Sequence, residues 1–264
     1  MDVSRSNVRM PVVFIGHGSP MNAIERNDFT RTLADLGARL PRPVAILSIS
    51  AHWYIGDLLV LSHPKPETIY DFWGFPRPLY QVRYPAPGYP DGAALTANLL
   101  RADHAVQSDE WGFDHGTWSV LVHLFPKADI PVFQLSLDYH RSPQDHYRLG
   151  QKIKELRDLG VLILGSGNIV HNLGRLVPGR NAQPWSWALE FDAGIKEALV
   201  SRNHDALTNY EMAFSATARF AVPTPDHYLP LLYCAAASDR GEAPQFPFEG
   251  FEQASISMRA VQWG

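Results

Sequence analysis

One short apolar segment that stops at a histidine constrains the fold more than any other part of this sequence. Residues 11–15 are apolar and mostly β-branched or aromatic, which predicts a buried β-strand. His17 follows this strand directly and lies between Gly16 and Gly18. In open α/β sheets, ligands bind in the crevice beyond the carboxyl ends of the strands. His17 is therefore a candidate ligand-binding residue.

A second apolar segment repeats this arrangement and indicates the fold class. Residues 44–50 predict another buried strand, and His52 follows it; between the two strands, residues 29–40 carry apolar side chains at helical spacing. A strand–helix–strand unit makes its two strands parallel, so their ends lie at the same edge of the sheet. We predict an α/β fold with a central, mostly parallel or mixed β-sheet flanked by helices, in which His17 and His52 are close together.

A position at a strand end is weak evidence by itself. His63 also ends a predicted strand, residues 58–62, but its link to His52 is too short for a parallel crossover, so His63 should lie at the opposite edge of the sheet. On the residue pattern alone, His17 and His52 remain open between metal ligands and ordinary histidines.

Three further histidines lie near predicted element ends. His171 follows the predicted buried strand 161–164 and a Gly-Ser-Gly turn. His227 is expected in the first turn of a helix that Thr224 caps. His115 precedes a predicted helix and is either a hydrogen-bonding residue behind the site or a capping residue without chemistry. If His17, His52 and His227 converge, with His171 nearby, three imidazoles around one divalent ion leave coordination positions open, as catalytic sites do.

The cysteine content supports imidazole as the metal donor. The chain has eleven histidines and one cysteine, Cys234, which excludes an internal disulfide and a cysteine-rich cluster. Cys234 lies in an apolar helical run, so we expect a buried core thiol.

An aromatic loop over residues 64–78 has no helical or strand periodicity, and long loops of this kind are often functional. Its residues Tyr70, Phe72, Trp73 and Phe75 are candidates for the wall of a pocket that binds a flat substrate. The alternative is a loop that its aromatic side chains anchor to the core.

Composition excludes some partners. With 264 residues and 45% hydrophobic residues, the chain can bury a large core, and no linker or repeat divides it, so we predict one catalytic domain over residues 1–264. A net charge of −4 and the lack of a basic stripe argue against nucleic acid and anionic membranes as partners. Residues 1–7 lack an apolar signal core, which favours a cytoplasmic location. Nothing in the sequence indicates the oligomeric state.

Motifs spread over nearly the whole chain carry a family resemblance. They are Gly16-His17-Gly18-Ser19-Pro20, Ser50-Ala51-His52-Trp53, Asp71-Phe72-Trp73-Gly74-Phe75-Pro76, Phe113-Asp114-His115-Gly116-Thr117-Trp118, Gly165-Ser166-Gly167-Asn168-Ile169-Val170-His171-Asn172 and Asp226-His227-Tyr228-Leu229-Pro230. Taken together and in this order, they resemble the class III extradiol ring-cleaving dioxygenases of the 4,5-DOPA dioxygenase type, in the LigB-like superfamily.

The resemblance implies an enzyme with a non-haem divalent metal, Fe(II) for turnover, that opens a catechol beside its two hydroxyls with O2. It implies His17, His52 and His227 as metal ligands, His171 as the acid/base or a fourth ligand, and His115 behind the site. Unlike relatives that complete the site with a glutamate, this chain has no glutamate at the matching place, and Asp226 is the nearest carboxylate. An all-histidine site also leaves Zn(II) possible.

Two other functions remain open at this point. A zinc-dependent hydrolase would use the same imidazoles to make a bound hydroxide, with Asp114 or Asp226 as the base. A non-enzymatic metal-binding interaction protein would keep the fold without the chemistry.

Overall fold

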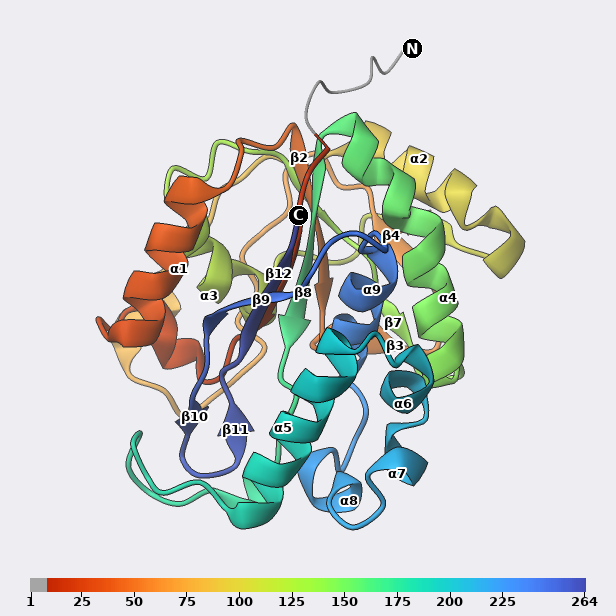
Figure 1. Ribbon diagram of the computed structural model, residues 1–264. Coiled ribbons are helices and arrows are strands. Elements are labelled where there is room, and N and C mark those ends of the chain that lie inside the picture. The colour runs from red at the N-terminus through yellow and green to blue at the C-terminus, as the bar shows by residue number, and fades with distance from the viewer. Residues whose placement is uncertain (1–8) are drawn as a thin grey trace.

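The computed structural model describes residues 9–264 and contains a six-stranded sheet at its centre (Figure 1). The strands follow the order β6-β2-β8-β1-β12-β9. Their bounds are Val132–Gln134 for β6, Ala45–Ser50 for β2, Val161–Gly167 for β8, Val12–Gly16 for β1, Ala260–Trp263 for β12 and Gln245–Phe248 for β9. Short two-stranded pairs surround this sheet: β3 (Tyr54–Ile55) with β7 (Leu137–Asp138), β4 (Leu59–Leu61) with β5 (Val106–Ser108), and β10 (Phe251–Glu252) with β11 (Ile256–Ser257).

The central sheet is mixed, and its parallel part includes the two strands that precede His17 and His52. β1 and β2 both pair in parallel with β8, which lies between them, whereas β12 pairs antiparallel with β1 and β9 antiparallel with β12. The predicted parallel relation of the first two long strands is therefore confirmed. The strand between them comes from residues more than a hundred positions later in the chain, and the local pattern did not predict this insertion.

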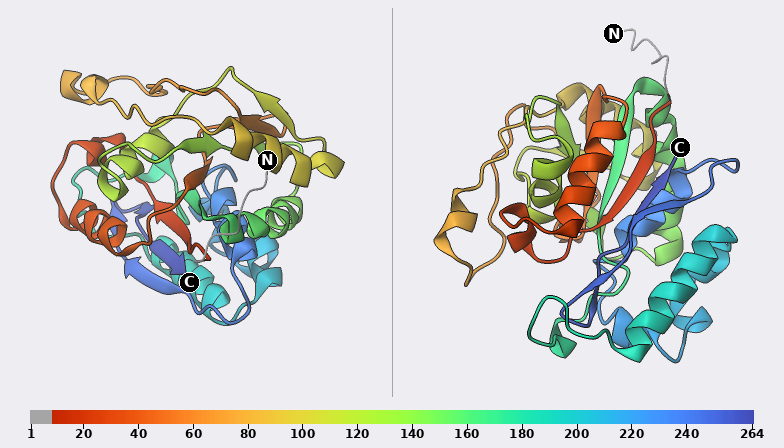
Figure 2. Two further views of the ribbon diagram at one scale, coloured as in Figure 1. Left: turned by 90° about the horizontal axis from the view of Figure 1, so that it is seen from above. Right: turned by 60° about the vertical axis from the view of Figure 1, so that its left-hand side comes forward.

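Helices cover both faces of the sheet (Figures 1 and 2). Alternate residues of β1 supply the two faces: Val12 and Phe14 belong to one core cluster, and Val13 and Ile15 to the other. On the Val13 side lie α1 (Asp28–Arg39) and α3 (His115–Leu124), and on the Val12 side lie α4 (Pro143–Ile153), α5 (Ser186–Val200) and α9 (Leu229–Ala237). The remaining helices are α2 (Pro90–Leu99), α6 (His204–Thr208), α7 (Tyr210–Ala213) and α8 (Ala218–Ala221). This is the single-domain α/β fold predicted from the sequence.

Local capping explains where the helices that cover the parallel strands begin and end. The Asn27 side chain accepts from the Thr30 amide while the Thr30 hydroxyl accepts from the Asn27 amide, which forms a capping box at the start of α1. Ser142 and Asp145 do the same for α4. Gly160 has φ of 80°, in the left-handed region that favours glycine, and turns the chain directly into β8.

Two segments differ from what their residue pattern alone predicts. The pattern of residues 79–84 predicts a strand, but Arg77–Gln81 form a 3₁₀ helix, because the prolines at 76 and 78 fix φ and Pro78 lacks the N–H that a strand needs. The pattern of residues 210–220 predicts one helix, but the chain forms α7 and α8 there. Cys234 is fully buried in α9, as predicted.

Within residues 9–264, no helix is long and apolar enough to cross a membrane. Residues 1–7, which were predicted to lack a signal sequence, lie outside the described residues.

Candidate metal centre

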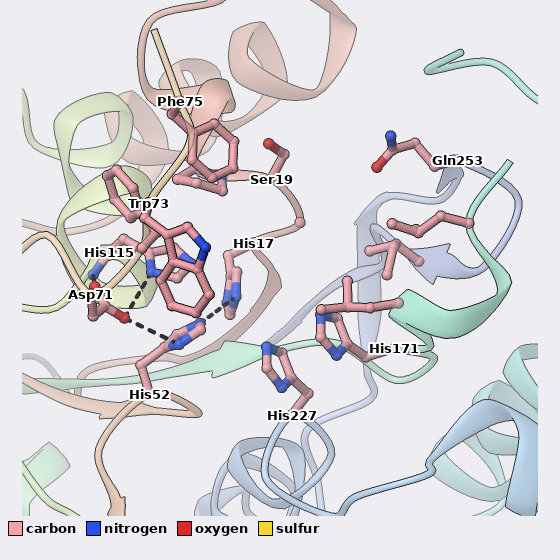
Figure 3. A pocket seen from close by; sticks show the side chains of 16 residues that line it. His17, Ser19, His52, Asp71, Trp73, Phe75, His115, His171, His227 and Gln253 are labelled. Carbon is pink, nitrogen blue, oxygen red and sulfur yellow. Dashed lines mark hydrogen bonds and ion pairs between the residues drawn. The ribbon is translucent and has the colours of Figure 1, made fainter. Parts of the chain in front are cut away.

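Five histidines line a cavity of about 490 Å³ at the carboxyl edge of the parallel strands (Figure 3). They are His17, His52, His115, His171 and His227. The structure thus brings together every histidine that the sequence indicated for the site. His63 is not among the lining residues. It follows β4, and the Val60–Leu135 bridge shows that β4 runs antiparallel to the end of β6. His63 therefore lies toward the opposite edge of the sheet, as expected.

His17 and His52 face each other on the cavity wall. Their Nε2 atoms are 3.1 Å apart. Two imidazole nitrogens bound at about 2.1 Å to one ion are separated by roughly 3.0–3.4 Å, so this pair has the spacing of two ligands of a single ion. The backbone holds His17 in this position. The His17 amide donates to the Gly167 carbonyl at 3.0 Å, and Gly18 takes φ of 60°, which glycine adopts without strain.

The partners of the other ring nitrogens, a hydrogen bond for His17 and a carboxylate contact for His52, favour the tautomers that face the cavity. The Ser166 hydroxyl donates to the Gly116 carbonyl at 2.5 Å, so its oxygen accepts from His17 Nδ1, 3.0 Å away. His52 Nδ1 lies 3.2 Å from a carboxylate oxygen of Asp71, which favours the proton on that nitrogen. In the neutral rings, both Nε2 atoms therefore carry a lone pair.

Burial keeps these two rings neutral. It lowers the pKa of His17 and of His52 well below 6.5, and the neighbouring histidines lower both further. At neutral pH neither ring then has a spare proton to place between the Nε2 atoms. Two lone pairs facing each other at 3.1 Å repel, and a cation that both nitrogens bind removes that repulsion. The donor set fits a divalent metal ion.

His227 completes a triangle of rings with His17 and His52. The ring centroids are separated by 5.0 Å for His17–His52, 5.1 Å for His52–His227 and 5.3 Å for His17–His227. Three imidazoles that radiate from one ion place their centroids roughly 4.6–5.3 Å apart, given metal–nitrogen distances of about 2.1 Å. The Asp226 carboxylate pairs with His227 Nδ1, so Nε2 is the ring nitrogen that remains for a ligand.

Asp226 is ionised beside this ring. Burial alone would raise the pKa of its carboxyl group, but the hydrogen bond and charge of His227 lower that pKa to about 2. The expectation that His227 lies in the first turn of a helix was wrong: α9 begins at Leu229, and His227 lies in the preceding turn. Gly167 permits this position, because a Cβ there would lie 2.1 Å from the His227 carbonyl oxygen.

His115 also lies within reach of the site. One nitrogen each of His17, His52 and His115 lie within 4.8 Å of one another, and no other trio of the described residues meets that spacing, so this trio competes with His17, His52 and His227 as the ligand set. The His52 and His115 ring centroids, however, are only 3.8 Å apart, which is too close for both rings to radiate from one ion.

Asp71 connects His115 to His52. It accepts from His115 Nδ1 at 2.8 Å and from the His115 amide at 2.9 Å, while its Oδ2 also contacts His52. Burial alone would raise the pKa of Asp71, but its bonds to His115 lower it. No residue pattern predicts this role, and the available signal in the sequence was an aspartate within the aromatic loop.

His171 lies against His227 in a different way from the other rings. The two rings stack face to face with centroids 3.5 Å apart and planes 5° from parallel. Ring lone pairs lie in the ring plane, so parallel stacked rings direct them side by side and not toward one point. Burial lowers the pKa of His171 well below 6.5, with a further contribution from His227, so the ring is neutral.

Part of the aromatic loop forms the wall of the cavity. Phe72, Trp73 and Phe75 line it, and the Trp73 side chain is 87% exposed at its mouth. Tyr70 does not line the cavity: its hydroxyl donates to the Val82 carbonyl at 2.6 Å. The prediction that Tyr70 contacts substrate is therefore corrected to a role in packing behind Phe72.

Neither carboxylate suggested as a hydrolytic base is free. Asp114 is fully buried and caps α3, and it accepts from Ser50 Oγ at 2.6 Å and from Gln134 Nε2 at 2.8 Å. Burial, followed by the charge of Asp71, raises the pKa of Asp114. Asp226 is paired with His227. The carboxylate that does line the cavity, Asp71, is bonded to His115 through both of its oxygens.

With this geometry in view, comparison with known proteins decides the family. The sequence family described as "Catalytic LigB subunit of aromatic ring-opening dioxygenase" matches residues 11–257. The chain belongs to the LigB family. Members of this family depend on a metal ion, in agreement with the histidine cluster.

Similar proteins support the enzyme class of this LigB-family chain. A 4,5-DOPA dioxygenase extradiol of Escherichia coli K12 is 43% identical over 100% of this chain and 98% of its own length. Proteins of the same name from Beta vulgaris and Portulaca grandiflora are 36% and 34% identical, over 91% and 95% of this chain and 91% and 94% of theirs. A crystal structure of an uncharacterized Escherichia coli K12 protein has a TM-score of 0.86 and 40% identity, covering 97% of this chain and 100% of the other. This LigB-family chain is an extradiol ring-cleaving dioxygenase.

Proposed function

We propose that this dioxygenase uses one Fe(II) ion to open a catechol of the DOPA type beside its two hydroxyl groups, with O2 as the second substrate. The observation that carries the proposal is the pair of neutral, buried imidazoles whose Nε2 lone pairs face each other at 3.1 Å at the head of an aromatic-walled cavity. The substrate class is supported by the name that the full-length relatives share.

His17, His52 and His227 are the proposed ligands, because their rings form the near-equilateral triangle described above. When bound, the ion supplies positive charge and open coordination positions, which favour binding of a diol and of O2. Fe(II) is proposed over Zn(II) because ring opening by O2 needs a redox-active metal, and zinc has no redox chemistry.

His171 is the proposed acid/base. Its ring is neutral, so it can accept the proton of a substrate hydroxyl and return it later. Because the ring stacks parallel to His227, its nitrogens do not point at the ion that His227 would bind. Phe72 and Phe75 pack edge to face with centroids 5.2 Å apart and present a wall against which an aromatic ring can lie and exclude water.

The test is reconstitution of metal-free protein with Fe(II) under anaerobic conditions, followed by addition of DOPA and measurement of O2 uptake and of the coloured ring-opened product. We expect one O2 consumed per DOPA with Fe(II), and no O2 uptake with Zn(II) or without metal. Hydrolytic activity with Zn(II) in place of O2 uptake would contradict the proposal in favour of a hydrolase. Metal binding without turnover of any catechol would favour a non-enzymatic interaction protein.

A further inference from the structure

The cavity has an end that the proposed chemistry does not use. Figure 3 shows Gln253 on the side of the cavity away from His52 and Asp71. The cavity lining also includes Leu176, next to the Val177 amide that bonds to Gln253, and Ile256, three residues after Gln253. A catechol ring held among the histidines would direct a ring substituent toward such residues.

Gln253 takes an unusual backbone conformation in the connection between β10 and β11. Its φ is 51° and that of Ala254 is 68°, both in the left-handed region that favours glycine or asparagine. Neighbouring backbone holds it there: the Gln253 amide donates to the Arg180 carbonyl at 3.1 Å, and the Val177 amide donates to the Gln253 carbonyl at 2.9 Å. Glutamine is not favoured by this backbone conformation, which points to a role for its side chain.

The side-chain amide of Gln253 is available to a ligand. Within residues 9–264, the hydrogen bonds of Gln253 are the two that its backbone makes, while its side chain lines the cavity. A carboxamide has two N–H donors and a carbonyl acceptor, so it can bind a carboxylate and an ammonium group at the same time.

The charge around this end of the cavity limits what it accepts. No lysine or arginine is among the described residues that line the cavity. The guanidinium of Arg180, whose backbone holds Gln253, is paired with Glu25 and Glu252. A substituent with a net negative charge would therefore find no compensating cation, whereas a zwitterion brings its own.

We propose that Gln253 is a specificity-determining residue that binds the ring substituent of the substrate, and that it selects an α-amino-acid zwitterion over a simple carboxylate. The inference rests on the proposed catechol-cleaving function and adds the residue that binds the amino-acid substituent.

The test compares kcat/KM for four diols that share one ring: DOPA, dopamine, 3-(3,4-dihydroxyphenyl)propionate and 4-methylcatechol. Gln253→Leu removes the hydrogen bonds at similar volume, and we expect it to lower kcat/KM for DOPA about tenfold, while the value for 4-methylcatechol changes less than about twofold. Gln253→Glu should reverse the preference and favour dopamine over DOPA, because it places an unpaired carboxylate at this end. Gln151→Leu, at an exposed position on α4, is the matched control.

The outcomes distinguish failure of the proposed catechol-cleaving function from failure of the specificity role of Gln253. If wild-type protein cleaves none of the four diols, the proposed function itself fails. If it cleaves them but Gln253→Leu changes all four values equally, or none, the specificity role is refuted. Metal content and melting temperature are measured for every variant. Should Gln253→Leu fail to fold, Gln253→Asn keeps an amide and tolerates the left-handed region, and its shorter reach should lower the DOPA value alone.

Discussion

Replacing Asp71 by asparagine tests whether hydrogen bonds behind the ligands determine metal affinity. One carboxylate oxygen of Asp71 lies 2.8 Å from His115 Nδ1 and 3.2 Å from His52 Nδ1. Asparagine keeps the shape, but its amide has one oxygen and one NH₂ group. If the oxygen stays toward the rings, the charge is lost; if the NH₂ group faces them, the Nδ1–H of His52 loses its partner and the proton moves to Nε2, toward His17.

The expected loss of metal affinity in Asp71→Asn follows from the contacts that the substitution changes. A hydrogen bond to a charged group contributes about 1.5–3 kcal/mol, and the neutral amide retains part of it. Loss of a partner behind a metal-binding histidine typically weakens the metal or the activity by about 10- to 100-fold, which equals about 1.4–2.7 kcal/mol. We expect metal affinity of Asp71→Asn to fall within that range.

The assay is competition for Fe(II) with a chelator of known affinity, followed by kcat/KM for a catechol at saturating metal. Asp35→Asn is the matched control, because Asp35 is exposed on α1 and far from the cavity-lining residues. A variant at Asp71 with unchanged metal affinity and unchanged kcat/KM would refute the role assigned to this carboxylate.

Three further predictions concern single histidines. His227→Ala should lose most bound metal on dialysis whereas His115→Ala retains it, measured by elemental analysis; the reverse result would favour the ligand trio that contains His115. His171→Gln should keep its metal and lose about 100-fold in kcat, since general acid–base catalysis contributes about 10²–10⁴-fold. Burial lowers the pKa of His146 to about 4, so between pH 6.5 and 4 the unfolded chain takes up a proton that the folded chain does not. His146 alone therefore lowers the stability by about 2 kcal/mol from pH 7 to 5, and in urea unfolding the fall measured for His146→Gln should be smaller than that of the wild type by this amount.

The positions of His17 and His52 could be predicted because they depend on local patterns. A buried apolar strand, a helical segment and a second apolar strand leave one topology with both strand ends at the same edge. The strand β8 between them could not be predicted from these residues, because the pairing of β1 and β2 with Val161–Gly167 is a long-range choice.

The rest of the site depends on segments without periodic sequence. Asp71 lies in an aperiodic loop, so no pattern predicts that its carboxylate reaches the histidines at the strand ends. His227 was expected inside a helix because Thr-Pro resembles a helix start, yet the chain makes a separate turn before Leu229. Tyr70 could not be distinguished from Phe72 by type, because only the direction of its side chain removes it from the cavity.

The charge balance of the site explains how it can hold a divalent ion without a carboxylate ligand. His17, His52 and His171 are neutral, while Asp71 and Asp226 have lowered pKa values and are ionised. Buried carboxylates are costly unless a positive charge compensates them, and the described cavity lining has no lysine or arginine. The negative charge that a ligating glutamate would bring lies instead behind two of the proposed ligands, next to Nδ1 of His52 and of His227. A divalent cation bound by the proposed ligands would therefore lie near two compensating carboxylates, although none of those ligands is itself an anion.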